Sequence, residues 1–155
     1  MAETERFRIY IAAYLVLRKK GEILLSRRFN TGYHDGEYSL VAGHLDGGET
    51  ATQAILREAK EEVGITLKKK DVHVAHIMHR YRKDREYIDI YLTAEQWSGD
   101  LQNLEPNKCD DLRWYPVVGL PQTLLPEVRQ ALHCIETGQF YSEIGWEEQA
   151  VSGKL

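Results

Sequence analysis

Apolar residues between positions 51 and 63 recur at the spacing of one face of an α-helix. Thr50 precedes this segment and Gln53 follows three residues later, which is the sequence of an N-terminal capping box. Gly64 comes directly after the last apolar residue, where a left-handed C-terminal cap is common. The pattern therefore predicts an amphipathic helix over 51–63. Its core-facing residues are expected to be Ala51, Ile55, Leu56, Ala59 and Val63.

The other apolar segments are rich in β-branched and aromatic residues and predict strands. They are 7–17, 22–28, 38–42, 72–81, 86–96 and 112–117, with turns at 19–21 and 82–85. Residues 126–136 predict a second helix that ends before Gly138. With one helix on either side, the strands predict an α/β/α sandwich around a mixed sheet. The length of 155 residues favours a single domain over 1–155.

Composition narrows the classes of partner. Hydrophobic residues make up 43% of the chain, which is enough for an ordinary core. The net charge is −4 and no basic stripe is visible, so we do not expect a nucleic-acid polymer as partner. No apolar run reaches about 18 residues, and the charged start at 1–6 lacks the apolar stretch of a signal peptide. Two cysteines, Cys109 and Cys134, favour the reducing cytoplasm, away from any membrane.

Three glutamates crowd the predicted helix at Glu58, Glu61 and Glu62. Like charges three and four residues apart destabilise a helix, and a bound cation is the simplest compensation. Glycines in the preceding stretch, 43–48, allow sharp bends and close approach of the backbone to a ligand. Mg²⁺ prefers carboxylate oxygens, water and substrate phosphates, so the pattern favours a dication with a small anionic substrate. The alternative is a solvated acidic face, the usual meaning of such a run taken alone.

Histidines recur at His73, His76 and His79, and zinc is the alternative metal to consider. Side chains alternate between the two faces of a strand, so His73 and His79 should share a face that His76 does not. This geometry argues against a zinc site.

The spacing of residues around the predicted helix resembles the signature of the Nudix hydrolases. The matching residues are Gly43, Glu49, Arg57, Glu58, Ala59, Glu61, Glu62, Gly64 and Ile65. A chance match at a given start is on the order of 10⁻⁸ or below at average residue frequencies. Ala59 is smaller than the usual aliphatic residue at its position. The matching segment, called the Nudix box below, covers 43–65. The strand pattern around it extends the likeness over most of the chain.

The resemblance implies a loop–helix–loop that binds Mg²⁺ or Mn²⁺ and hydrolyses a nucleoside diphosphate linked to another group. By position, Glu58 and Glu62 would be metal ligands, and the Gly43 carbonyl would complete the metal shell. Glu61 would be a further ligand or the base that acts on the attacking water.

The same resemblance implies an ion pair between Arg57 and Glu49. This pair would hold the loop against the helix and support catalysis from outside the metal shell. Taken alone, such a pair is a structural salt bridge by default, and we keep its role mainly structural.

Outside the Nudix box, candidates for substrate binding are less specific. Arg27 and Arg28 end a predicted strand beside the loop and present guanidinium forks suited to phosphate, with a surface charge pair as the alternative. Tyrosines offer stacking surfaces for a base, although most strand tyrosines are packing residues. Tyr81 lies at a spacing that resembles the subgroup acting on dinucleoside polyphosphates. Glu105, in the loop before residue 112, is the candidate for an additional metal ligand, against a solvated loop acid.

The aromatic tail at 140–146 has three possible positions: docked on its own domain, lining the pocket, or pairing two subunits in a homodimer. We expect it to dock on its own domain.

These observations predict a Mg²⁺-dependent hydrolase of the pyrophosphate bond in a nucleoside triphosphate or related nucleotide. The alternatives within enzymes are a dinucleoside polyphosphate or nucleotide-sugar hydrolase. A non-catalytic nucleotide-sensing module is disfavoured, because it would have no need of the intact set of three glutamates.

Overall fold

The computed structural model describes residues 4–147 of the chain. The strands are β1 (Tyr10–Lys19), β2 (Glu22–Arg28), β3 (Tyr38–Ser39), β4 (Val41–His44), β5 (His73–Arg82), β6 (Arg85–Ala94), β7 (Cys109–Pro116) and β8 (Tyr141–Ile144). The α-helices are α1 (Ala51–Val63) and α2 (Pro126–Glu136), and the short 3-10 helices are η1 (Lys69–Asp71) and η2 (Val117–Gly119). Helix α1 has the predicted bounds, and so does α2.

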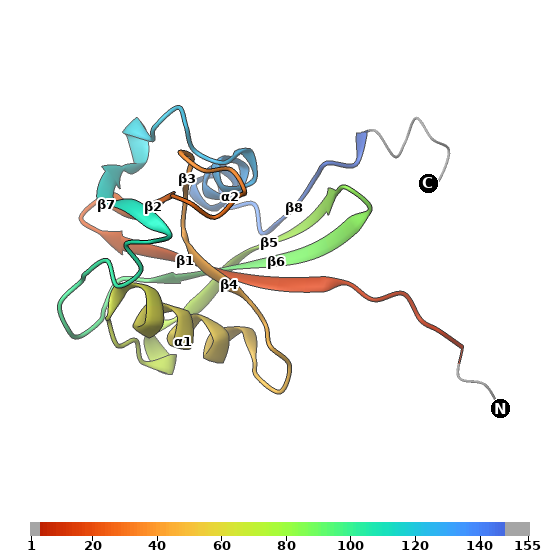
Figure 1. Ribbon diagram of the computed structural model, residues 1–155, viewed down its shortest axis with the longest axis horizontal. Helices are drawn as coiled ribbons and strands as arrows, with labels where there is room; N and C mark the ends of the chain where they lie inside the picture. The colour runs from red at the N-terminus through yellow and green to blue at the C-terminus, as the bar shows by residue number, and fades with distance from the viewer. Residues whose placement is uncertain (1–3, 148–155) are drawn as a thin grey trace.

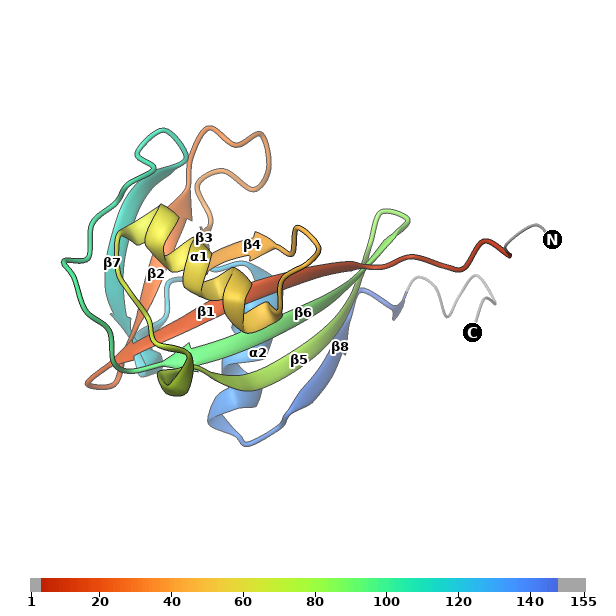
Figure 2. The same cartoon turned by 90° about the horizontal axis from the view of Figure 1, so that it is seen from below.

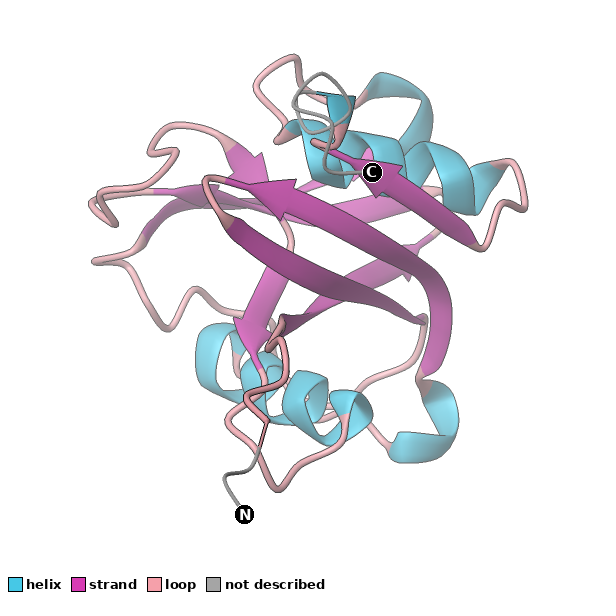
Figure 3. Ribbon diagram, turned by 90° about the vertical axis from the view of Figure 1, so that its right-hand side faces the viewer, coloured by secondary structure: helices cyan, strands magenta, loops and turns pink. Residues whose placement is uncertain are grey.

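Strand β1 organises the mixed sheet. It pairs with β6 in parallel and with β4 and β2 antiparallel. Strand β6 continues the sheet through antiparallel β5, and β5 pairs with β8 in parallel. On the other side, β2 pairs with β3 and β7. Figures 1 and 3 show α1 on one side of this sheet and α2 on the other, so the predicted α/β/α sandwich is confirmed.

Alternate residues of β1 supply the two cores, because successive side chains of a strand point to opposite faces. Ala13, Leu15 and Leu17 pack in the cluster that contains the buried face of α1. Tyr14 and Val16 pack in the cluster that contains the buried face of α2. Figure 2 shows β1 running beneath α1 through the middle of the sheet. Among the described residues, no helix is long and apolar enough to cross a membrane.

The ends of α1 follow the sequence signals. The Gln53 backbone N–H donates to the Thr50 hydroxyl, and the Thr50 N–H donates to the Gln53 side chain, so the capping box is complete. Gly64 adopts a left-handed conformation with φ of 73° and ends the helix. Local capping chemistry therefore sets both helix ends, as predicted.

Strand boundaries differ from the sequence predictions where pairing partners decide them. The predicted strand 38–42 is interrupted at Leu40, because β3 pairs with β2 whereas β4 pairs with β1. Strand β1 begins at Tyr10 rather than residue 7, and Phe7 is 74% exposed. Strand β7 begins at Cys109, three positions before the predicted start at 112.

The tail docks on its own domain, as expected, and does so by adding β8 to the sheet edge. No strand was predicted there. Just beyond β8, the Trp146 indole N–H donates to the His79 carbonyl at 3.0 Å. Gly145, with φ of 86°, lies so close to the Tyr81 carbonyl that a Cβ at this position would overlap it. This close approach lets the tail lie flat against β5.

Replacing Gly145 with alanine should therefore release the tail. We expect Gly145→Ala to lower the free energy of unfolding by about 2–3 kcal/mol, from the left-handed backbone and the overlap together. Gly138→Ala is the matched control, because Gly138 has φ of 75° but open space around it. The control should lose only about 1 kcal/mol. Urea denaturation measures both, and equal losses would contradict the role of the close approach.

Candidate active site

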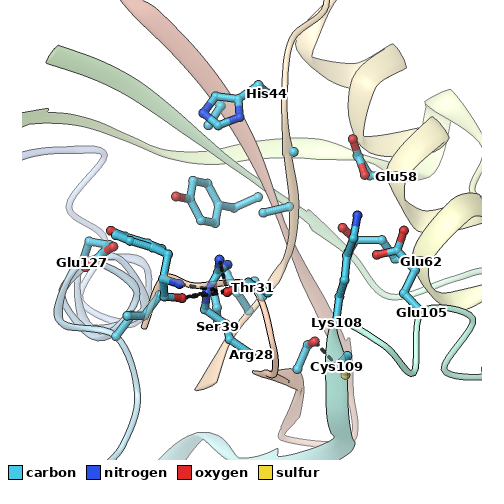
Figure 4. Close-up of a pocket in the computed structure, with 18 of the residues that line it drawn as sticks. Arg28, Thr31, Ser39, His44, Glu58, Glu62, Glu105, Lys108, Cys109 and Glu127 are labelled. Atoms are coloured by element: carbon cyan, nitrogen blue, oxygen red, sulfur yellow. Dashed lines mark hydrogen bonds between the residues drawn. The ribbon is translucent and has the colours of Figure 1, made fainter. Parts of the chain in front are cut away.

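One cavity of about 880 Å³ lies between α1, the β2–β3 loop and the β5–β6 hairpin. This volume is in the range of small-ligand sites. Figure 4 shows Glu58, Glu62 and Glu105 on one side of the cavity and Arg28 on another. The cavity therefore has an acidic wall on the α1 side, with Lys108 beside it, and the rest of the lining includes arginines and Glu127.

The acidic wall forms where α1 packs against β4. A Cβ at Gly43 would overlap the Glu58 carboxylate, so only glycine lets this side chain lie against the β4 backbone. The Glu58 side chain is 13% exposed, whereas that of Glu61 is 54% exposed. Glu58 thus sits in the helix–strand junction, and Glu61 lies at its solvent edge.

Arg57 links the loop to the acidic wall. Its Nη2 lies 2.8 Å from one oxygen of Glu49 and its Nε lies 3.2 Å from the other. Its Nη1 contacts Glu58 at 2.8 Å and Glu61 at 3.4 Å. The hydrogen bonds from Arg57 lower the pKa of Glu49. The ion pair between Arg57 and Glu49 implied by the sequence is present, and it ties the loop before α1 to the helix.

Burial among like charges shapes the ionisation of the acidic wall. Burial, followed by the charges of Glu58 and Glu105, raises the pKa of Glu62 to about 9. Burial also raises the pKa of Glu58, and hydrogen bonding to Arg57 opposes that shift. Glu105 reaches this cluster from the loop before β7 and lines the same cavity. These carboxylates would lose their mutual repulsion beside a cation.

The donor set fits a hard dication in its chemistry. All the side-chain donors are carboxylate oxygens, which Mg²⁺ and Mn²⁺ prefer over nitrogen or sulfur. Within residues 4–147, no three acidic, histidine or cysteine side chains already converge as a metal cluster. Glu58 and Glu61 both turn toward Arg57. Each contacts Arg57 through one carboxylate oxygen, so the other oxygen of each side chain remains for ligation.

The predicted substrate-binding residues divide between the cavity and the surface. Arg28 lines the cavity, but Arg27 points elsewhere and forms an ion pair with Asp110 at 2.6 Å. Tyr81 does not line the cavity: its ring packs on Trp146, 5.2 Å between centroids. Its neighbours on β5 face the cavity, and alternation places Tyr81 on the opposite face. The structure thus gives no support to substrate binding by Arg27 or Tyr81.

The histidine prediction was wrong about the strand faces. A β-bulge before His76 shifts the register, so His73 and His76 pair with Thr93 and Tyr91 of β6, on one face. His79 lies on the other face. The His76 Nδ1 lies 2.8 Å from the Gln139 carbonyl, and its Nε2 lies 2.7 Å from the Ser142 hydroxyl. Both partners belong to the segment that leads into and forms β8. This histidine anchors the tail and does not contribute to a metal site.

The sequence predictions missed the arginines of the β5–β6 hairpin. Arg80, Arg82 and Arg85 all line the cavity. Strand alternation predicts that Arg80 and Arg82 share one face of the strand. It does not predict which face of the strand meets the cavity. At the cavity floor, Arg80 donates to both oxygens of the fully buried Asp89, at 2.5 and 3.0 Å. Although burial alone would lower the pKa of Arg80, Asp89 raises it, and the guanidinium stays charged.

Comparison with known proteins identifies the family of this chain. A family model described as the NUDIX domain matches residues 6–133, and the chain belongs to this family. The chain is a Nudix hydrolase. A MutT NUDIX hydrolase from Burkholderia pseudomallei, known from its crystal structure, is 25% identical in sequence to this chain. The two structures superpose with a TM-score of 0.74 over 82% of this chain and 98% of that one. The MutT protein from Methanosarcina mazei Go1 has the same fold, at 22% identity and TM-score 0.71, over 84% and 94% of the two chains.

Curated relatives include proteins named NAD-capped RNA hydrolase NudC. The one from Escherichia coli O157:H7 is 31% identical over 124 residues, which are 79% of this chain and 45% of the relative. The one from Vibrio parahaemolyticus is 29% identical over 74% of this chain and 41% of the relative. The chain therefore spans less than half the length of these relatives.

Breaking the buried pair at the cavity floor should be costly. We expect Asp89→Asn to lower the free energy of unfolding by about 3 kcal/mol, because it leaves the Arg80 charge buried without a partner. The double variant Arg80→Met with Asp89→Leu should be more stable than Asp89→Asn, since it buries no unpaired charge. Chemical denaturation tests both variants. A double variant less stable than Asp89→Asn would contradict this account.

Proposed function

We propose that this Nudix hydrolase cleaves the pyrophosphate bond of a nucleoside triphosphate or a related nucleoside diphosphate derivative, by attack of water at phosphorus. The observation that carries the proposal is the wall of half-buried carboxylates, Glu58, Glu62 and Glu105. The same cavity contains Arg28, Arg82 and Arg85, which form no ion pair with any residue that the structure describes. Such a cavity suits an anionic substrate only if a cation reverses the charge of the acidic wall.

Mg²⁺ or Mn²⁺ is the proposed cofactor. Glu58 and Glu62 would hold it, together with the Gly43 carbonyl, and Glu105 would add a ligand from the loop. A dication here would neutralise charge on the pyrophosphate oxygens and lower the pKa of bound water. Glu61, the most exposed of the three helix acids, would act as a further ligand or accept the proton of the attacking water.

The protein's own contribution is to hold these groups in place. Arg57 anchors Glu49 in the loop and restrains Glu58 and Glu61 on the helix. Arg28 lines the cavity and is proposed to bind a substrate phosphate. Its Nε donates to the Tyr33 carbonyl at 2.7 Å, which fixes the side chain toward the β2–β3 loop.

A second candidate substrate is a dinucleotide joined by a diphosphate. The NudC relatives favour it, because their names refer to an NAD cap and the similarity covers 79% of this chain. The cavity of about 880 Å³ also has room for more than one phosphate group and a base. Both candidates place a diphosphate at the acidic wall, so the same chemistry serves either one.

A product screen separates the two candidates. The purified protein with Mg²⁺ or Mn²⁺ would be supplied with ordinary and oxidised nucleoside triphosphates, dinucleotides, dinucleoside polyphosphates and nucleotide sugars. We expect a nucleoside monophosphate and pyrophosphate from a triphosphate, or two monophosphates from a dinucleotide such as NAD. Products identified by mass spectrometry decide between them. Tight nucleotide binding without turnover under all these conditions would instead indicate a sensing module.

Removal of one half-buried carboxylate should abolish turnover. We expect Glu62→Gln to lower the rate at least a thousandfold, about 4 kcal/mol of barrier, because the amide is a poor ligand for the proposed dication. Glu95→Gln is the control: Glu95 is exposed, lies outside this cavity, and its loss should leave the rate unchanged. Unchanged turnover in Glu62→Gln would overturn the metal assignment.

A further inference from the structure

Two arginines at the tip of the β5–β6 hairpin line the cavity without a carboxylate partner. Arg82 and Arg85 face each other as the last pair of the hairpin. In the part of the chain that the structure describes, neither forms an ion pair, whereas Arg80 and Arg27 are each bound by an aspartate. Glu127 of α2 lines the same cavity, but among residues 4–147 it forms no ion pair with Arg82 or Arg85. Positive charge in a cavity without an ion-pair partner favours an anionic ligand.

The two acids at the tip of the hairpin are engaged elsewhere. Asp84, in the turn, accepts a hydrogen bond from the Tyr81 hydroxyl at 3.3 Å. Glu86 pairs with His79 at 3.0 Å, on the face of the hairpin that turns away from the cavity. Strand alternation thus directs Glu86 away from the cavity, whereas Asp89, on the cavity face, is already paired with Arg80.

The aromatic residues beside the arginines position guanidinium groups and leave little surface for a base. The Arg82 guanidinium lies 3.9 Å from the centroid of the Tyr33 ring, and that of Arg85 lies 5.6 Å from the ring of Tyr10. The Tyr87 ring stacks on Tyr10, with 5.4 Å between centroids, on its β1 side. On its β5 side, the Arg80 guanidinium lies 4.1 Å from the centroid of the Tyr87 ring. With these neighbours in place, the rings hold the arginine forks so that their N–H groups remain for an anion.

The hairpin turn restricts where the two charges lie. Lys83 and Asp84 form a two-residue connection in which both adopt positive φ, 45° and 66°, the conformation of a tight hairpin turn. The flanking arginines are therefore held directly across the ladder from each other. Since both residues extend from one rung of the ladder into the same cavity, their guanidinium groups could turn toward one phosphate and donate to its oxygens together.

We propose that Arg82 and Arg85 form a subsite for a phosphate group that lies beyond the diphosphate to be cleaved. This inference rests on the proposed function, since it assigns the cleaved diphosphate to the acidic wall. The preferred substrate then carries at least one further phosphate. That group is the third phosphate of a nucleoside triphosphate or a phosphate on the second nucleoside of a dinucleotide.

Substrate pairs that differ by one phosphate test the subsite directly. We would compare ATP with ADP for the first source of the phosphate, and NADP⁺ with NAD⁺ for the second. In at least one pair, wild-type protein should favour the more phosphorylated member by roughly tenfold or more in kcat/KM, as expected for charge-assisted hydrogen bonds. Arg82→Gln and Arg85→Gln should each reduce that preference, mainly through KM, and change kcat/KM for the other member by less than about threefold.

Two further variants sharpen the comparison. Arg82→Lys keeps the charge but loses the planar fork, so it should retain part of the preference. Arg113→Gln is the matched control: the Arg113 side chain is 59% exposed, pairs with Asp111 and lies outside the cavity. The Arg113→Gln variant should show the same preference for the more phosphorylated substrate as the wild type. If wild-type protein hydrolyses these nucleotides without preference, or if both glutamine variants keep the preference, the subsite is refuted while the proposed function stands.

A binding measurement tests the subsite independently of turnover. Inorganic triphosphate would be titrated calorimetrically into the protein in the presence of Mg²⁺, because the acidic wall of the cavity would otherwise repel it. We expect the wild type to bind it, and Arg82→Gln with Arg85→Gln to weaken binding at least roughly tenfold, since two charge-assisted contacts are lost. Absence of binding to the wild type, or equal binding to the double variant, would overturn the inference. Absence of hydrolysis of every nucleotide would instead refute the proposed function.

Discussion

The site depends on the close packing of carboxylates from α1 against the backbone of β4. Gly43 has no Cβ, and this lets Glu58 enter the helix–strand junction. Once there, Glu58, Glu62 and Glu105 repel one another in a partly buried space. Arg57 offsets part of this charge, and its contacts to the preceding loop make the loop part of the same unit. The crowding is an energetic cost to the fold that ligand binding would relieve.

The sheet holds this junction at a fixed place. Because β1 is buried on both faces, it joins the core beneath α1 to the core beneath α2. Strand β4 pairs directly with β1, so Gly43 is held against the centre of the sheet. On the far side of β1, β6 carries the hairpin whose arginines line the cavity. The acidic wall and the arginines are thus positioned by neighbouring strands of one sheet.

Local signals in the sequence predicted what local structure determines. The ends of α1 follow from Thr50, Gln53 and Gly64, all within the helix or next to it. The split at Leu40 and the added strand β8 depend on partners far along the chain, so periodicity alone did not reveal them. The histidine faces were predicted wrongly for a related reason, since one bulge in β5 reverses every later side chain.

The sequence therefore predicted the acidic wall of the cavity but not the arginines of the β5–β6 hairpin. The acidic wall comes mainly from a single helix and loop, where spacing alone brings Glu58 and Glu62 together. The arginines depend on which face of β5 meets the cavity, which is why Arg82 was missed. Tyr81 was chosen for its spacing from the helix, and its ring lies on the other face of β5. Under the proposed function, this division would also separate chemistry from specificity. A hairpin that contributes charges from outside the acidic helix would change which phosphate-bearing group is accepted, while the carboxylates proposed to hold the cation stay the same.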